Sequence, residues 1–142
     1  MKKTLFIMLV GIFVLSLCSG YSMAYTGPSH IKEGSINGVK FLTGGVGSDE
    51  RTAMQKMAKG NYNLQFVFAE ASGPYLADVK VDIQSMDGKK IVDMPTAGPW
   101  FFAKLPSGQY KITVTHGGKS EVQHLNVAKN FQRVIFSWNA KM

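Results

Sequence analysis

Four aromatic side chains are the residues of this chain best suited to contact a ligand or a partner. Exposed aromatic rings stack on sugar rings and anchor protein interfaces. The same side chains fill a core when they are buried, so their exposure decides between the two roles. The candidates for a ligand or partner contact are Tyr75, Trp100, Phe101 and Trp138.

The sequence lacks the motifs that place an activated nucleophile or a catalytic metal. Neither Gly-x-Ser-x-Gly nor His-Glu-x-x-His occurs, and the single cysteine, Cys18, lies near the amino terminus. Asp78 and Asp82 alternate with Lys80, which is typical of the solvated face of a strand rather than of a cleft with paired carboxylates. We therefore expect no catalytic residue, no cofactor and no enzymatic activity.

Two pairs of residues raise the question of metal binding. Met54 and Met57 lie one helical turn apart, a spacing that suits copper(I) but equally suits the packing of a core. His116 and His124 flank a Gly117-Gly118 turn, and residue 116 should lie opposite residue 119 or 120. That register separates the two imidazoles along the strands, which is poor for a shared zinc ion. We expect packing and surface roles, and no metal site.

A glycine-rich run, Gly44-Gly45-Val46-Gly47, leads into an expected helix over residues 48–60. Ser48 or Asp49 can cap the first turn, and Gly60 can end the helix. Free amides at such a helix start can cradle an anion. The Lys-Ser/Thr ending of a phosphate-binding loop is missing, so a flexible connection is the preferred interpretation.

From residue 61 onward the apolar residues alternate with a period of two. Seven such runs are separated by turn signals such as Asp87-Gly88 and Gly117-Gly118. Short, regularly spaced strands of this kind indicate an antiparallel β-sandwich over residues 61–142. The expected strands are Leu64–Glu70, Asp78–Ser85, Lys90–Met94, Trp100–Leu105, Tyr110–His116, Ser120–Val127 and Arg133–Trp138.

Two of these strands carry apolar residues on both faces. Trp100 and Phe102 share one face, so Phe101 points the other way, and Val67 likewise opposes its neighbours. A two-layer sandwich needs only one apolar face per strand, so the second face requires a cover. We expect the helix to pack on the outer face of one sheet, near Val67 or Phe101.

The amino-terminal residues have the layout of a secretory signal peptide. Lys2 and Lys3 precede an apolar run over residues 5–17, and small residues end at Ala24, the expected cleavage site. An alternative is lipidation at Cys18, although Leu17 is unusual before an acylated cysteine. Cleavage would leave no transmembrane segment, a loosely ordered arm over residues 25–47 with a short strand near Val39 to Leu42, and a periplasmic or secreted location.

Charge gives no sign of a nucleic-acid partner. The formal net charge is +7, but the lysines are scattered among acids instead of forming the clustered face that nucleic acids require. Such mixing is typical of a solvated surface, on which edge lysines discourage aggregation of strands.

Three segments together carry a family resemblance: Ala77-Asp78-Val79-Lys80-Val81, Asp87-Gly88-Lys89 and Leu105-Pro106-Ser107-Gly108-Gln109-Tyr110. In the last of them Pro106 presets a turn, and the Tyr110 hydroxyl should reach a backbone group near it. These segments resemble carboxypeptidase regulatory-like domains, and the chain is similar to small exported proteins of Gram-negative bacteria that contain them. The resemblance implies a seven-stranded antiparallel Greek-key sandwich of the transthyretin-like type over roughly residues 60–138.

The resemblance implies a non-catalytic binding or accessory module whose partner is an unknown protein or glycan of the cell envelope. The alternative is a carbohydrate-binding β-sandwich domain. Some transthyretin-like proteins hydrolyse oxidised purines and end in Tyr-Arg-Gly-Ser. This chain ends in Trp138-Asn139-Ala140-Lys141-Met142, so the resemblance does not extend to that activity.

Overall fold

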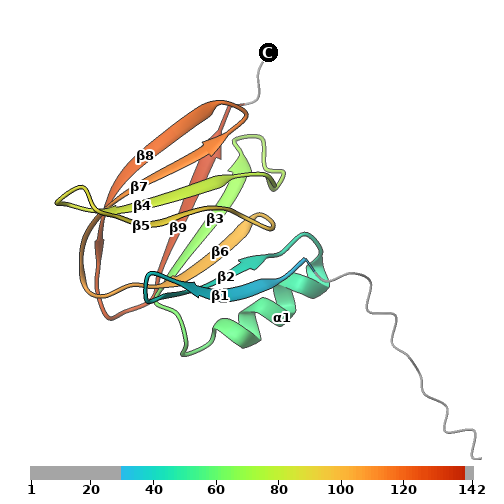
Figure 1. Ribbon diagram of the computed structural model, residues 1–142. Coiled ribbons are helices and arrows are strands. Elements are labelled where there is room, and N and C mark those ends of the chain that lie inside the picture. Colours follow the sequence, from blue (N-terminus) through green and yellow to red (C-terminus); the bar gives the residue numbers. More distant parts are fainter. Residues whose placement is uncertain (1–29, 140–142) are drawn as a thin grey trace, which may run out of the picture.

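The computed structural model describes residues 30–139 (Figure 1). This part of the chain is mainly β, with two sheets and one helix. The predicted signal peptide, residues 1–24 with Cys18, lies outside the described residues. Within residues 30–139, no helix is long and apolar enough to cross a membrane.

The strands form a five-stranded sheet with the order β1-β2-β6-β3-β9 and a four-stranded sheet with the order β5-β4-β7-β8. All neighbouring strands are antiparallel except β3 and β9, which run parallel. The strands are β1 Lys32–Ile36, β2 Val39–Gly44, β3 Leu64–Glu70, β4 Lys80–Ser85, β5 Lys90–Pro95, β6 Trp100–Lys104, β7 Gly108–His116, β8 Lys119–Val127 and β9 Gln132–Trp138.

The parallel pairing corrects the fully antiparallel prediction at one sheet edge. The connection from β8 to β9 is short and places Gln132 beside the start of β3. There the Gln132 N–H donates to the Asn63 carbonyl at 2.9 Å. Because β9 begins at the end where β3 also begins, the two strands must run in the same direction. Leu64 lies opposite Gln132, and Glu70 lies opposite Trp138.

All seven predicted strands are present with ends shifted by at most two residues, but two further strands precede them, so the count of seven does not hold. β1 and β2 lie within the segment 25–47 expected to be a loosely ordered arm, and the short strand expected near Val39 to Leu42 is part of β2. Asn37 (φ 49°) and Gly38 (φ 77°) form the turn between them. Positive φ at both positions is the requirement of a two-residue hairpin turn, which Asn-Gly meets at low cost. This local turn chemistry outweighs the polar, glycine-rich composition.

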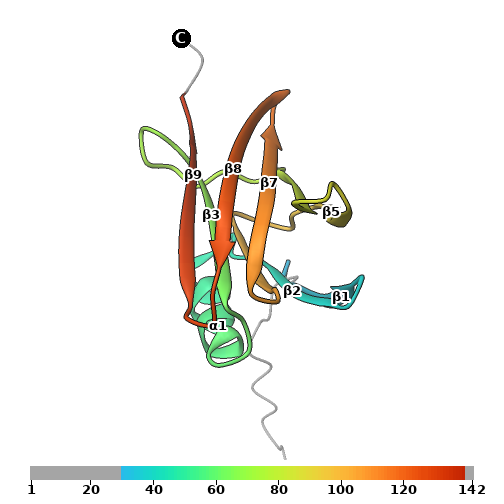
Figure 2. The ribbon, with the colours of Figure 1, turned by 90° about the vertical axis from the view of Figure 1, so that its left-hand side faces the viewer.

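The two sheets pack face to face around one hydrophobic core. Figure 2 shows β3 and β9 in one layer beside β7 and β8 in the other. Phe66 stacks on Phe101 with ring centroids 6.0 Å apart and meets Phe136 edge-on at 5.3 Å. The side chains that the four-stranded sheet contributes to this core include Val81, Ile83, Ile112 and Val114, all fully buried.

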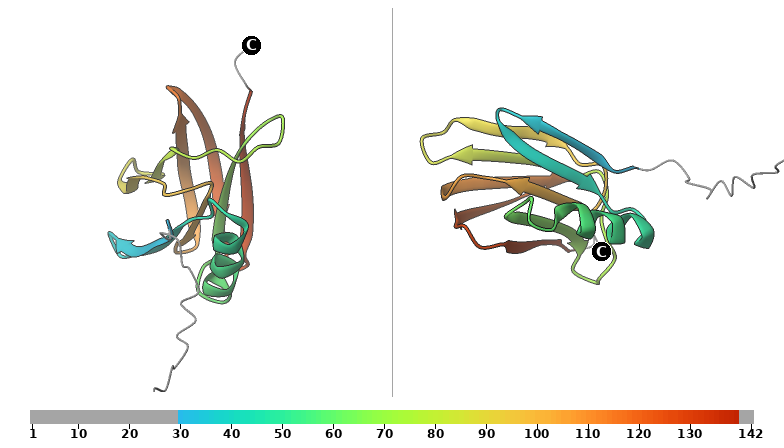
Figure 3. Two further views of the ribbon diagram at one scale, coloured as in Figure 1. Left: turned by 90° about the vertical axis from the view of Figure 1, so that its right-hand side faces the viewer. Right: turned by 90° about the horizontal axis from the view of Figure 1, so that it is seen from below.

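The helix α1 (Ser48–Ala58) packs on the outer face of the five-stranded sheet, where it runs beside β2 (Figure 3). Met54 is fully buried and Met57 is half-buried in a second apolar cluster that also contains Val67. Apolar side chains at helical spacing thus cover the second apolar face of β3. The predicted packing of the helix near Val67 is confirmed.

On β6 the same helix covers the face opposite to the one that carries Phe101. Trp100 and Phe102 lie in the cluster under the helix, whereas Phe101 is buried between the sheets. β6 is flanked by β2 and β3 and covered on both faces, so every one of its apolar residues has a place in a core. The prediction that the helix lies near Phe101 is therefore wrong. The prediction that Phe101 faces away from Trp100 and Phe102 is right.

The turn after β6 has the predicted geometry. Leu105 is buried, and the Tyr110 hydroxyl donates a hydrogen bond of 2.7 Å to the Pro106 carbonyl. Burial of the ring raises the pKa of Tyr110. This hydrogen bond fixes the Leu105-Pro106-Ser107 turn, which forms one wall of the site described next.

Candidate functional site

Three of the four candidate aromatic residues are buried. Trp100 is 4% exposed, Phe101 0% and Trp138 4%, so their rings pack in the two cores and cannot stack on a ligand. Only Tyr75 is exposed, at 46%, and the Arg51 guanidinium lies over its ring, 4.9 Å from the centroid. The four residues therefore do not form a binding platform.

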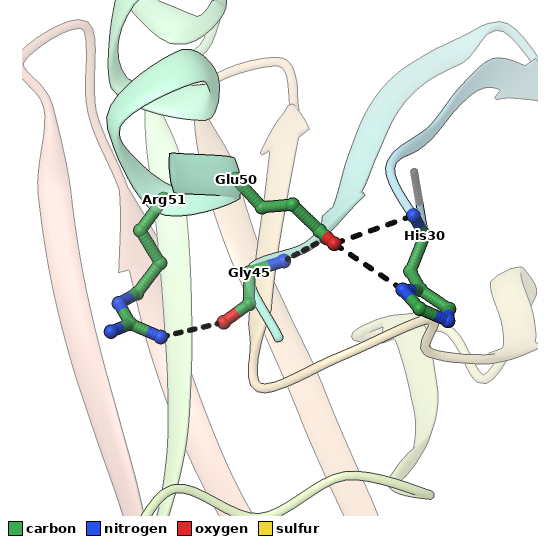
Figure 4. Close-up of polar contacts among 4 residues, drawn as sticks. All are labelled: His30, Gly45, Glu50 and Arg51. Carbon is green, nitrogen blue, oxygen red and sulfur yellow. Dashed lines mark hydrogen bonds and ion pairs between the residues drawn. The ribbon is translucent and has the colours of Figure 1, made fainter. Parts of the chain in front are cut away.

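The glycine-rich loop before α1 is occupied by a carboxylate of the chain itself (Figure 4). Glu50 Oε1 accepts a hydrogen bond from the Gly45 N–H at 3.3 Å, and Glu50 Oε2 accepts one from the His30 N–H at 3.5 Å. The His30 imidazole lies 3.3 Å from the same oxygen, and Arg51 donates to the Gly45 carbonyl at 2.9 Å. Glu50 and Arg51 thus both bind Gly45, and these contacts tie the loop to the start of the helix.

The charged side chains on the outer face of the four-stranded sheet pair with one another. Lys80 lies 3.1 Å from Asp93, and Lys90 lies 3.3 Å from Asp82 and 3.5 Å from Asp93. The hydrogen bond from Lys80 lowers the pKa of Asp93, and the one to Asp82 raises the pKa of Lys90. The lysines and Asp93 are exposed while Asp82 is partly buried, and these ion pairs belong to the solvated face that the sequence predicts.

The histidines are too far apart along the strands to share a ligand. His116 lies opposite Lys119 and His124 lies opposite Lys111, which is the predicted register. Among residues 30–139, no group of three or more His, Cys, Asp or Glu side chains is placed to hold a metal ion.

A cavity of about 900 Å³ opens beside the carboxyl-terminal end of α1. We call it the α1 pocket. Its walls come from the end of α1 and the following loop, from the end of β6 with its turn, and from the connection between β8 and β9. The lining residues are Gln55, Ala58, Lys59, Gly60, Asn61, Tyr62, Asn63, Gln65, Phe102, Lys104, Leu105, Pro106, Ser107, Lys129, Asn130 and Phe131.

Aromatic rings form the apolar surface of the α1 pocket. The Phe102 ring centroid lies 6.0 Å from that of Tyr62 and 6.4 Å from that of Phe131. Tyr62 and Phe102 are buried and fixed, whereas Phe131 is 52% exposed at the mouth. The apolar area that these rings offer to a ligand therefore comes mainly from Phe131.

The Tyr62 hydroxyl is held by two acceptors that lie outside the pocket lining. It donates to Glu33 Oε1 at 3.4 Å and to the Phe41 carbonyl at 3.3 Å. Burial and, secondarily, the negative charge of Glu33 raise the pKa of Tyr62 to about 12. The phenol therefore stays neutral at physiological pH, and Tyr62 acts at the pocket as an apolar ring.

The charged residues that line the α1 pocket are all basic. Lys59, Lys104 and Lys129 come from three different segments, and no Asp or Glu occurs among the described residues that line the cavity. None of the three ammonium groups lies within 4.0 Å of a carboxylate elsewhere in residues 30–139. A fourth cation, Lys40, lies directly opposite Lys104 across the β2–β6 pair.

Asn63 ties two walls of the α1 pocket together. Its Nδ2 donates to the Leu105 carbonyl at 2.8 Å and to the Ala128 carbonyl at 3.4 Å, while its Oδ1 accepts from the Leu105 N–H at 3.0 Å. One side chain thus joins the turn after β6 to the connection before β9. The pocket is part of the fold and does not depend on a ligand for its shape.

The residues of this pocket differ from those that the sequence indicates. None of the four candidate aromatics lines it, and Phe131 and the three lysines are absent from the prediction. Phe131 carries a usable signal, because a large apolar residue follows Lys129-Asn130 in a short polar connection. The lysines carry none, since only the fold brings Lys59, Lys104 and Lys129 to one rim.

A comparison with known protein-family models and one with curated proteins found no match to this chain.

Proposed function

We propose that this protein is a non-catalytic binding or accessory module, periplasmic or secreted, which holds its ligand in the α1 pocket. The observation that carries the proposal is the cavity of about 900 Å³ with buried aromatic rings in its wall. Preformed, mostly apolar cavities of roughly 300–1,000 Å³ with a few convergent polar groups are the usual form of small-molecule sites.

The resemblance to carboxypeptidase regulatory-like domains, with a transthyretin-like Greek-key sandwich, supports the same proposal. Such domains serve as accessory and binding modules, and a pocket at one end of two packed sheets is compatible with that role. Export through the predicted signal peptide would place the pocket in the cell envelope, where an exported protein or a glycan could supply the ligand.

A carbohydrate is the second candidate ligand, and one observation favours it. The amide residues Asn61, Gln65 and Asn130 line the cavity, as does Phe131 with its exposed ring. Amides that bind hydroxyl groups next to an aromatic ring are a common arrangement for holding a sugar. The burial of Trp100, Phe101 and Trp138 leaves this hypothesis without the larger platform that the sequence suggests.

Nitrogen-15 NMR of the mature protein tests the proposal. A library of oligosaccharides and of neutral, cationic and anionic small molecules would be added one compound at a time. We expect at least one compound to shift the amide signals of residues 59–65, 104–107 and 129–131. The NMR spectrum of that compound itself should stay unchanged over a day. Shifts confined to other surfaces, or conversion of the compound to a product, would contradict a binding module that uses this pocket.

A further inference from the structure

We propose that the α1 pocket is selective for single-chain amphipathic anions, of which a long-chain carboxylate is the simplest. This inference rests on the proposed function and specifies its ligand class. The apolar chain would lie against Phe131, and the carboxylate would lie at the rim between the lysines.

The apolar half of this ligand follows from the wall of the cavity. Phe131 at the mouth is the exposed ring of this wall, at 52%, whereas Tyr62 and Phe102 behind it are buried and support it through the contact of Phe102 with both other rings. Removing an apolar chain from water against Phe131 is favourable in proportion to the area buried. A short polar ligand would leave this exposed ring unused.

The negative head group follows from the charges. Lys59, Lys104 and Lys129 surround one cavity without a carboxylate in its described lining, and Lys40 adds a fourth positive charge beside Lys104. This contrasts with the four-stranded sheet, where Lys80 and Lys90 are paired with Asp93 and Asp82. Like charges that converge without a partner repel one another, and a bound anion relieves that repulsion.

The nearby acids do not line the α1 pocket. Glu33 contacts the lining through the Tyr62 hydroxyl, at 3.4 Å. Asp49 and Glu50 lie in the first turn of α1, at the end of the helix away from the pocket, and Glu50 is engaged by Gly45 and His30. All charged residues in the described lining of the pocket are therefore lysines.

Three probes that share a twelve-carbon chain separate charge from hydrophobicity: dodecanoate, dodecyltrimethylammonium and dodecanol, each below its aggregation threshold. Calorimetry and amide shifts would follow binding to the mature protein. A charge-assisted contact strengthens binding, so dodecanoate should bind at least about tenfold more tightly than either other probe. Raising the salt to about 0.5 M should reduce that preference, because exposed charges are screened.

Two matched triple variants test the lysines. Replacing Lys59, Lys104 and Lys129 by Gln should weaken dodecanoate binding at least about tenfold and leave dodecanol binding unchanged. Replacing the exposed Lys32, Lys111 and Lys119, which lie outside the pocket lining, by Gln removes the same net charge and should leave dodecanoate binding within about twofold. Phe131→Ala should weaken dodecanoate and dodecanol alike.

Equal binding of dodecanol and dodecanoate, or equal losses in the two triple variants, would overturn the selectivity for anions. If oligosaccharides or neutral compounds shift the pocket amides and dodecanoate does not, the ligand class is wrong while the binding module stands. If no compound shifts those amides, both proposals fail. Binding to vesicles of anionic phospholipid without binding of monomeric dodecanoate would identify the basic rim as a membrane contact, which also overturns this inference.

Discussion

Replacing Asn63 by Ala should destabilise the protein far more than replacing Asn61, its neighbour in the same loop. Asn63 makes two short side-chain hydrogen bonds with Leu105, at 2.8 and 3.0 Å, and a longer one of 3.4 Å to Ala128. Each hydrogen bond contributes about 1 kcal/mol net, and a partly buried partner left unpaired costs about 1–3 kcal/mol more. The Asn63→Ala variant should therefore lose about 2–4 kcal/mol of unfolding free energy.

Asn61 is a matched control because it is the same residue type two positions away. Its exposed side chain makes one hydrogen bond, to the Met57 carbonyl at 2.9 Å, so Asn61→Ala should cost no more than about 1 kcal/mol. Urea unfolding followed by tryptophan fluorescence would measure both variants, and the midpoint of Asn63→Ala should fall by roughly 1–2 M. Equal midpoints for the two variants would refute the role assigned to Asn63, as would unchanged hydrogen exchange at the Leu105 amide.

Two further predictions concern the helix and the pH dependence of stability. Met54→Ala should lower the unfolding free energy by about 2–5 kcal/mol, because a fully buried side chain between the helix and the sheet is lost. Met57→Ala, at a half-buried position, should cost clearly less. Equal melting temperatures for the two variants would show that the helix does not pack as described. The pKa of Tyr62 is raised from 10.0 to about 12 in the folded protein, so the unfolded chain releases this proton first as the pH rises. Unfolding free energy should be fully present below pH 10 and fall between pH 10 and about 12, and this decline should be smaller in Tyr62→Phe when urea titrations are repeated across that range.

The strands could be predicted from the sequence because their signal is local. Alternation of apolar residues and turn dipeptides such as Asp87-Gly88 depend only on neighbours, and all seven predicted strands are present. The helix was accessible for the same reason, and its cover of Val67 followed from strand parity. The strand expected near Val39 to Leu42 is β2, whereas β1 and its hairpin turn were not predicted, although the turn chemistry of Asn37-Gly38 is also local.

The α1 pocket could not be predicted from the sequence, because it is a product of long-range packing. Lys59 follows the helix, Lys104 ends β6 and Lys129 precedes β9, so no sequence spacing relates them. The conspicuous aromatics were poor guides for a physical reason. Trp100, Phe101 and Trp138 lie on strands that are covered by another layer, and large rings there are needed to fill the cores. The single exposed ring of the pocket lies in a loop.

The parallel pairing of β9 with β3 also determines when this chain can finish folding. The hairpins β1–β2 and β7–β8 join neighbours in sequence, but the five-stranded sheet is complete only when β9 pairs with the edge of β3. Pairings between distant segments form late, and an unpaired β3 edge would expose Phe66 and Phe68 to other chains until then. A chain still emerging from a ribosome therefore lacks a complete five-stranded sheet until β9 is released. Fragments that stop before β9 should be prone to aggregation instead of forming smaller folded domains.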